Sequence, residues 1–338
     1  MIDLSVSLGP LRLSHPLINA SGTLDLFEVA AGLGDAILAD PPVAAYVPKT
    51  VTLKPRPGND PPRIVEVEAG MLNSIGLPNA GVEAFVADEL PRLLALPRPL
   101  ILNVGGFAPG EYALVAARLR RALQLHLGGG PPDGPSPSSD EIRAAVGGDL
   151  PAWTARVGLE LNVSCPNVHS GCMSIGADPG ETRVAVEGAR AEWPGLLVVK
   201  LTPNVTNVVP VAQAAAEAGA SAISLVNTFK GLVLDRVTLR PYLGGVTGGL
   251  SGPAIKPLAL RFVYEVAAAV DVPLIGMGGV TSVQDVLEFM ACGASAVAVG
   301  AAGFRDPWLP ARLAAELGLA LEGRGWSLSD LVGRAHRR

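Results

Sequence analysis

The chain of 338 residues contains only three cysteines, Cys165, Cys172 and Cys292, and no Cys-x-x-Cys pair. So few cysteines, in an odd number, argue against a disulfide framework and fit a reducing compartment. Three thiols also fall short of the four that an ordinary iron–sulfur cluster takes. We therefore expect no such cluster in this chain.

Charged and aromatic side chains are also scarce, at 17% and 4% of the residues, and the net charge is −5. A mildly acidic chain argues against a nucleic-acid groove and against a basic patch for membrane lipids. So few aromatic rings disfavour an antiparallel sandwich and a surface on which bases stack. We therefore expect neither nucleic acid nor membrane as a partner.

Targeting segments and long apolar runs are missing as well. The start, MIDLSVSLGP, has no basic region followed by an apolar core. The stretch with most membrane character, 289–304, is shorter than the ~20 residues of a spanning helix. The Gly-x-Gly-x-x-Gly fingerprint of a dinucleotide site is absent, and no metal ligands are assigned. These features predict a cytoplasmic protein.

Glycine (40 residues) and proline (30 residues) are abundant, which argues against a helix bundle. Short apolar runs alternate with longer Ala/Leu-rich segments, as in a parallel sheet buried on both faces. Eight such units predict an α/β protein with a closed (β/α)8 TIM barrel, and a doubly wound open sheet is the alternative. The expected strands are Pro16–Ile18, Tyr46–Val47, Leu100–Val104, Gly158–Val163, Leu196–Lys200, Ala222–Val226, Val272–Met277 and Ala296–Val299.

Two regions break this rhythm. Residues 128–139, GGGPPDGPSPSS, are of low complexity and indicate an insertion near 128–150 without a catalytic role. Residues 228–254 form a long excursion after the sixth strand, on the face where a lid or ligand clamp is expected. We assign residues 1–320 to a single barrel and 321–338 to a C-terminal tail.

Polar or glycine residues follow nearly every expected strand, and in a barrel they would converge on the C-terminal mouth. Glycines after the last two strands permit close backbone approach to a phosphate. Lysines that end apolar strands favour anionic ligands. These strand-end residues are Ser21, Lys49, Asn103, Asn162, Lys200, Asn227, Thr228, Gly278, Gly279 and Gly300.

The segment ELNVSCPNV (160–168) places Cys165 just beyond a strand, between Ser164 and Pro166. A thiol at a ligand mouth acts as a nucleophile or as a proton acceptor. Cysteine nucleophiles usually have a histidine base, but His169 follows only four residues later. This context favours proton transfer.

Together, several motifs resemble the dihydroorotate dehydrogenase family, in particular its class 1 flavoenzymes of pyrimidine biosynthesis. The cysteine of the fourth motif is typical of class 1, and the seventh motif is similar to the class 1B branch. The motifs are NASGT (19–23), PKTVTLKPRPGN (48–59), GMLNSIGLPN (70–79), ELNVSCPN (160–167), VKLTPNVT (199–206), LVNT (225–228), GGVTGGLSGPAIKP (244–257), IGMGGV (275–280) and AVAVGAA (296–302).

The resemblance implies a barrel with FMN at its mouth and dihydroorotate as the substrate. The positions that match the family's FMN site are Ser21, Lys49, Thr50, Asn103, Asn162, Lys200, Val226, Gly252, Gly278, Gly279, Gly300 and Ala301. Those that match its substrate site are Lys49, Asn73, Ser74, Ile75, Gly76, Leu77, Asn162, Asn167, Asn227 and Thr228. Ala301 departs from the family, in which a threonine is expected.

The implied reaction removes a proton from C5 of dihydroorotate and a hydride from C6. Cys165 matches the catalytic base, and flavin N5 takes the hydride. Lys49 would oppose the substrate carboxylate, and Lys200 would lie against the N1–C2=O edge of the flavin. Because a free thiol has a pKa near 8.5, activity is expected to rise with pH.

The resemblance also implies partners. The class 1B branch predicts a homodimer flanked by an iron–sulfur, FAD-containing subunit that passes electrons to NAD⁺, with fumarate or a quinone as alternative acceptors. Three other interpretations stay open: a different flavin-dependent dihydropyrimidine oxidoreductase, a non-catalytic flavin-binding subunit, and a barrel isomerase or synthase that acts on a sugar phosphate. Lys49 argues against uracil-like substrates, which carry no carboxylate.

Overall fold

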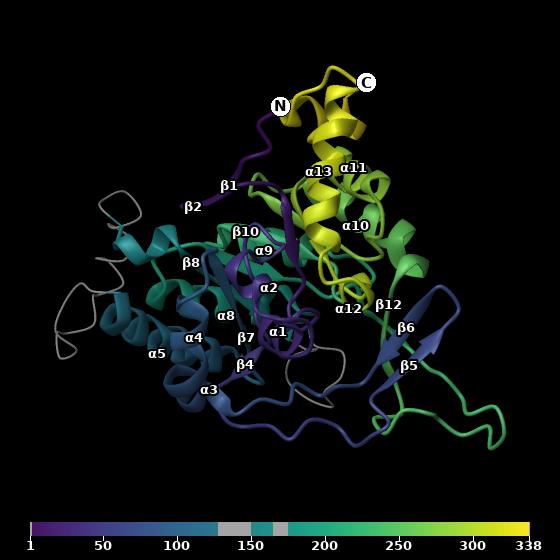
Figure 1. Cartoon of the computed structure of the whole chain (residues 1–338). Helices are drawn as coiled ribbons and strands as arrows, with labels where there is room; N and C mark the ends of the chain where they lie inside the picture. Colours follow the sequence, from purple (N-terminus) through teal and green to yellow (C-terminus); the bar gives the residue numbers. More distant parts are fainter. Residues whose placement is uncertain (1, 128–149, 165–174, 338) are drawn as a thin grey trace.

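The computed structural model describes residues 2–127, 150–164 and 175–337, and Figure 1 shows its chain path. At its centre lies a parallel sheet of eight strands in the spatial order β3–β14–β13–β10–β9–β8–β7–β4. Burial on both faces explains why these strands are apolar at most positions. The strands are β3 (Leu17–Asn19), β4 (Val51–Thr52), β7 (Leu100–Gly105), β8 (Val157–Asn162), β9 (Leu197–Lys200), β10 (Ala222–Leu225), β13 (Leu274–Met277) and β14 (Ala294–Val299).

The sheet closes into a ring through the segment before β4. The second barrel strand expected at Tyr46–Val47 is wrong, because only Tyr46 forms an isolated bridge there and the strand lies at Val51–Thr52. The N–H of Ala44 donates to the carbonyl of Leu17 at 2.9 Å, and Tyr46 forms a parallel bridge to β7. The amide of Asn19 donates to the carbonyl of Val47 at 2.7 Å and accepts from its N–H at 2.9 Å. A side chain thus replaces ladder hydrogen bonds here. The predicted barrel is confirmed, and the open sheet is wrong.

Helices surround the barrel and cover its outer face (Figure 1). The helix expected over 80–95 contains a π-helical turn, η1 (Phe85–Glu89), between α3 (Gly81–Ala84) and α4 (Leu90–Leu94). Pro91 lacks the N–H that an α-helix would need at this point, which accounts for the changed hydrogen-bond spacing. The other α-helices of the described residues are α1 (Leu26–Leu33), α2 (Ala36–Ala39), α5 (Pro109–Leu127), α8 (Pro179–Glu192), α9 (Val209–Glu217), α10 (Lys256–Ala267), α11 (Val283–Ala291), α12 (Ala302–Arg305), α13 (Leu309–Glu322) and α14 (Leu328–Leu331).

A hairpin of β1 (Val6–Leu8) and β2 (Leu11–Leu13) closes the amino end of the barrel. Its three leucines, Leu8, Leu11 and Leu13, are fully buried and belong to the same apolar cluster as the barrel interior. This interior is filled by small and branched side chains such as Ala222 and Val198. The strand pattern alone does not predict this hairpin.

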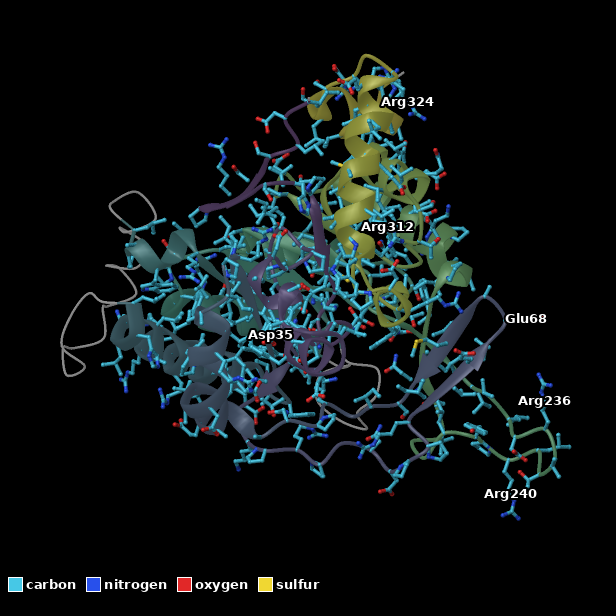
Figure 2. The ribbon with its side chains drawn as sticks, viewed as in Figure 1. Asp35, Glu68, Arg236, Arg240, Arg312 and Arg324 are labelled. Carbon is cyan, nitrogen blue, oxygen red and sulfur yellow. The ribbon has the colours of Figure 1, made fainter. Side chains whose placement is uncertain are left out.

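A second, antiparallel sheet stands at the mouth, in the order β11–β12–β6–β5. It combines β5 (Ile64–Val67) and β6 (Gly70–Asn73) with β11 (Phe229–Gly231) and β12 (Gly248–Ser251). The sequence predicts an excursion over 228–254 but not this sheet. Between β11 and β12 the chain extends away from the barrel, and Figure 2 shows Arg236 and Arg240 on this arm. Exposed apolar residues also lie on the arm: Leu232, Leu234, Val237, Leu239 and Val246.

The last residues are packed against the barrel's helices. Leu328 and Leu331 on α14 (Leu328–Leu331) are buried, and the N–H of Gly333 donates to the carbonyl of Met290 at 3.0 Å. The division at residue 320 stays a prediction, and the insertion at 128–139 lies outside the described residues. Within the described ranges, none of the helices combines the length and apolar character needed to cross a membrane.

Candidate active site

Polar side chains gather at the carboxyl end of the barrel, as the strand-end residues predict. Asn103 lies on β7, Asn162 ends β8 and Lys200 ends β9. Asn162 and Lys200 are register partners, so they lie side by side. These residues alternate with Leu161 and Val199, which belong to the outer core. The polar side chains therefore face the inside of the barrel.

A chain of hydrogen bonds joins the predicted cofactor residues across the mouth. The hydroxyl of Ser21 donates to the carbonyl of Pro48 at 2.8 Å and lies 3.4 Å from the hydroxyl of Thr50. Thr50 donates to Oδ1 of Asn103 at 2.5 Å, and Nδ2 of Asn162 lies 3.5 Å from Oγ1 of Thr50. Four of the expected residues, from four positions far apart in sequence, thus form one connected group.

The predicted substrate residues Asn162 and Asn227 meet at Ser164. Nδ2 of Asn227 donates to the Ser164 hydroxyl at 2.8 Å, and that hydroxyl donates to Oδ1 of Asn162 at 3.0 Å. The N–H of Thr228 donates to Oδ1 of Asn227 at 2.8 Å. Ser164, fully buried, is a residue that sequence reasoning passed over. Its position directly before the predicted base was the available signal.

The predicted base itself, Cys165, and the substrate residue Asn167 lie outside the described residues. Their assignments stay predictions. The chain on one side of them ends at Ser164, which the hydrogen bonds above fix at the mouth. The structure therefore brings the neighbour of Cys165 to the place where the base is expected.

Two lysines stand at the mouth. Lys200 is 5% exposed, and with the described residues it makes neither a hydrogen bond nor an ion pair. Because a lysine is seldom buried to this extent unless an anion or an electron-rich group is near its ammonium, this arrangement favours an anionic or electron-rich ligand. Lys49 is less buried and lies against the Ser21–Thr23 turn, where a Cβ on Gly22 would come within 3.3 Å of Nζ.

Glycines of two loops form a narrow cradle near the start of α10. Gly252, Gly278 and Gly279 all have positive φ, at 101°, 126° and 77°. A Cβ on Gly279 would lie 2.9 Å from the carbonyl oxygen of Gly252 and 3.1 Å from the backbone nitrogen of Lys256. Only glycine allows the two loops to approach so closely. Val226 borders this cradle, since a Cβ on Gly278 would lie 3.5 Å from its Cγ2.

The loop after β14 is more open. A Cβ on Gly300 would meet only Ala20, at 3.9 Å, so packing does not demand a glycine at this position. Ala301 precedes the short helix α12 and offers no side-chain donor. Backbone N–H groups are therefore what this loop can present to a ligand.

The predicted substrate segment Asn73–Leu77 turns from the mouth sheet towards the barrel. Asn73 donates to the carbonyl of Gly249 at 3.2 Å, which ties β6 to β12. Asn59 holds the turn, because its N–H donates to the carbonyl of Ile75 and its amide to the hydroxyl of Ser74, both at 3.0 Å. Gly76 and Leu77 follow with positive φ. Sequence reasoning did not assign a role to Asn59.

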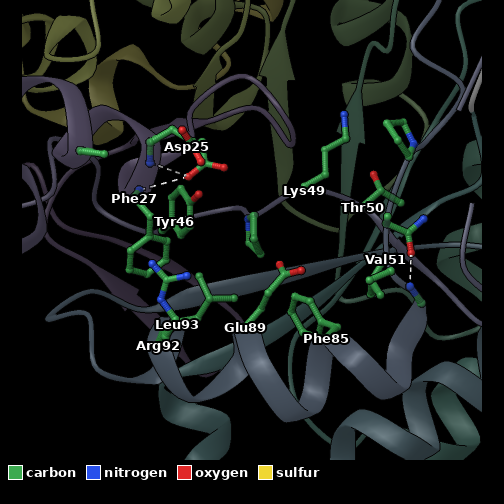
Figure 3. Close-up of a pocket in the computed structure, with 17 residues that line it drawn as sticks. Asp25, Phe27, Tyr46, Lys49, Thr50, Val51, Phe85, Glu89, Arg92 and Leu93 are labelled. Atoms are coloured by element: carbon green, nitrogen blue, oxygen red, sulfur yellow. Dashed lines mark hydrogen bonds between the residues drawn. The ribbon is translucent and has the colours of Figure 1, made fainter. Parts of the chain in front are cut away.

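A cavity of about 500 Å³ borders this site, with Lys49 and Thr50 in its wall (Figure 3). Asp25, which caps α1, and Glu89, which ends η1, line other parts of it. Burial and the nearby carboxylate of Asp25 raise the pKa of Glu89. Apart from Lys49 and Thr50, none of the predicted site residues that the structure describes lines this cavity.

Comparison with known proteins decides the family. The family model for dihydroorotate dehydrogenase matches residues 3–126 and 154–321. The chain belongs to the dihydroorotate dehydrogenase family. The gap between the two matched ranges contains the low-complexity insertion that the resemblance leaves unmatched.

Related proteins cover the chain almost completely. A protein of Pelobacter propionicus named dihydroorotate dehydrogenase B (NAD(+)), catalytic subunit, is 44% identical over 332 residues, which are 98% of each chain. A protein of the same name from Desulforudis audaxviator is 43% identical over 337 residues, 99% of this chain and 98% of its own. A dihydroorotate dehydrogenase from Eimeria tenella, solved with ferulenol, superposes with a TM-score of 0.71 at 21% identity. The superposition covers 99% of this chain and 89% of the Eimeria tenella chain, and this similarity of structure supports the barrel fold.

Proposed function

We propose that this member of the dihydroorotate dehydrogenase family oxidises dihydroorotate to orotate for pyrimidine biosynthesis, with FMN at the barrel mouth. The observation that carries this proposal is the convergence of Asn103, Asn162, Asn227 and Lys200 at one end of the barrel. Amides can both donate to and accept from the ring of a neutral pyrimidine. The buried lysine suits the electron-rich edge of a flavin.

The residues at the mouth fit FMN. Lys200 is a largely buried cation at the mouth, and Gly278 and Gly279 have positive φ in the loop after β13, where backbone N–H groups would meet the phosphate. FMN supplies a hydride acceptor when it is bound. The residues that would hold it are Ser21, Lys49, Thr50, Asn103, Asn162, Lys200, Val226, Gly252, Gly278, Gly279, Gly300 and Ala301.

In the proposed reaction Cys165 accepts the C5 proton at Sγ, while the C6 hydrogen leaves as a hydride and the C5=C6 double bond forms. The ammonium group of Lys49 faces the substrate carboxylate and balances its negative charge. The amides of Asn162, Asn167 and Asn227 orient the ring. The segment Asn73–Leu77 and Thr228 complete the substrate site, and the mouth sheet anchors that segment.

We also propose that electrons leave through a partner subunit. The relatives above are named catalytic subunits of NAD⁺-linked enzymes, and three cysteines are too few for an ordinary iron–sulfur cluster in this chain. A homodimer flanked by two iron–sulfur, FAD-containing subunits follows from the resemblance, as does a cytoplasmic location. Fumarate and quinones are the alternative acceptors to test.

The decisive experiment is an absorption spectrum of the purified chain, recorded without oxygen before and after dihydroorotate is added. We expect a yellow protein that dihydroorotate bleaches, and that dihydrouracil, which has no carboxylate, leaves yellow. A yellow protein that dihydroorotate leaves unchanged would contradict the substrate. A colourless protein that cannot be reconstituted with FMN would contradict the cofactor. Rapid NAD⁺ reduction by the chain alone would contradict the partner.

A further inference from the structure

A carboxylate lies inside the barrel, one layer beneath the mouth. Glu160 is 4% exposed and belongs to β8, every residue of which is buried. Its Oε2 accepts from Nδ2 of Asn103 at 2.5 Å, and its Oε1 accepts from the hydroxyl of Ser224 at 2.6 Å. None of the ion pairs among the described residues includes Glu160.

The fold itself does not need a polar group at this position. On β9 the register partner of Glu160 is the apolar Val198, and on β7 it is Asn103, with the apolar Ile101 one interior position below. Burying a carboxylate costs free energy, and an apolar side chain of similar size often stabilises a protein more. Glu160 therefore calls for an explanation other than packing.

Its contacts fix the direction of the hydrogen bonds above it. Both carboxyl oxygens of Glu160 act as acceptors in these two bonds, so Asn103 turns its NH₂ group down towards Glu160. The carbonyl of Asn103 then points to Thr50, whose hydroxyl proton is used in that bond. The oxygen of Thr50 is left as an acceptor facing Ser21 and Asn162.

We propose that Glu160 is a positioning residue, whose carboxyl group accepts from Asn103 and so orients the amide of Asn103 and the hydroxyl of Thr50, so that FMN meets the carbonyl of Asn103 rather than its NH₂ group. This inference rests on the proposed function, because Asn103 and Thr50 are taken to hold FMN. Glu160 itself touches neither cofactor nor substrate in this scheme.

The single variants Glu160→Gln and Ser224→Ala should both keep FMN binding, because each leaves Asn103 with an acceptor for its NH₂ group. In Glu160→Gln, the amide oxygen can still accept from Asn103, because the Ser224 hydroxyl can turn to accept from the new NH₂ group. In Ser224→Ala, the carboxylate still accepts from Asn103. Each variant alone keeps the orientation of Asn103, so we expect the FMN dissociation constant to rise by no more than about threefold.

The double variant Glu160→Gln/Ser224→Ala should differ. The new NH₂ group has lost its acceptor, and an orphaned buried donor is less tolerated than an orphaned carbonyl. The glutamine is then expected to turn its NH₂ towards Asn103, which must flip. We expect FMN affinity at least tenfold weaker than in the wild type and at least fivefold weaker than the product of the single effects. Glu160→Met removes the acceptors of both Asn103 and Ser224 and should weaken FMN at least tenfold, and the melting temperature of the apoprotein measures separately what the two orphaned donors cost in stability.

The measurement is FMN binding to apoprotein by fluorescence quenching, with the melting temperature of each variant and the KM and kcat for dihydroorotate. Additive single effects in the double variant, or wild-type FMN affinity in Glu160→Met, would overturn the proposal. If Glu160→Met is insoluble, the FMN affinities of Glu160→Gln, Ser224→Ala and their double variant are enough to test the proposal. A wild-type protein that binds FMN but is not bleached by dihydroorotate would refute the proposed reaction. The FMN affinities of the single and double variants would still test the role of Glu160. A wild-type protein that binds no FMN would refute both.

Discussion

The two ends of the barrel are closed in opposite ways. At the amino end, the leucines of the β1–β2 hairpin are fully buried in an apolar cluster. At the carboxyl end, the buried groups are polar, and Lys200 lacks a partner among the described residues. Apolar burial favours folding in proportion to area, whereas buried polar groups must be satisfied by specific partners. The amino end is thus built for stability, and the carboxyl end for a ligand.

The largest effect should come from the mouth, and it should leave stability unchanged. Cys165→Ala removes the proposed base, so the rate at which dihydroorotate bleaches the flavin should fall by about 10²–10⁴-fold. Stopped-flow spectroscopy measures that rate, and thermal melting checks that the fold is retained. Full turnover at neutral pH would contradict the assignment.

The opposite pattern is expected at the amino end. Leu11→Ala should lower the free energy of unfolding by about 2–5 kcal/mol, because it leaves a cavity in the apolar cluster that the β1–β2 hairpin forms at the amino end. Denaturation by urea measures this loss, and the FMN affinity should stay at its wild-type value. Leu232→Ala on the exposed arm is the matched control, with an expected change below about 0.5 kcal/mol. Loss of FMN binding in Leu11→Ala would show that the two ends are not independent.

Lys200 offers a test in which stability and binding change in opposite directions. Lys200→Met removes a buried cation, so the apoprotein should become more stable by about 1 kcal/mol or more. The same change should weaken FMN at least tenfold. Lys256→Met is the control, because Lys256 pairs with Asp285 at 2.6 Å and Glu288 at 3.0 Å and its loss should destabilise the protein. A destabilised Lys200→Met apoprotein would show that Lys200 does have a partner.

A further effect concerns pH at the amino end. Burial, with a smaller contribution from Arg98, lowers the pKa of His15 to about 4. The unfolded chain binds this proton near pH 6.5, so the contribution of neutral His15 to stability is complete above pH 6.5 and is lost as the pH falls towards 4. In His15→Asn, the urea concentration at the unfolding midpoint should depend less on pH between pH 4 and pH 6.5 than in the wild type. The exposed His126→Asn is the control, and an equal change in both variants would rule out His15 as the cause.

Much of the site was predictable because strand ends in a barrel share one location. The positions of Asn103, Asn162 and Lys200 follow from the strand pattern alone. The roles of Asn59, Glu160 and Ser164 did not follow, since each acts through a hydrogen bond to a residue that the chain path brings near. The mouth sheet also escaped prediction, because its strands are short and come from segments more than 150 residues apart.

The sequence by itself determined the α/β class, seven of the eight barrel strands and the family, because hydrophobic period and local motifs are properties of neighbouring residues. Only the tertiary structure decided how the ring closes at Asn19, what fills the amino end, and which way the buried amides point. Those features depend on contacts between distant segments, such as Asn19 with Val47 and Asn103 with Glu160. A hydrogen bond needs both partners at about 3 Å, and no local pattern encodes that distance.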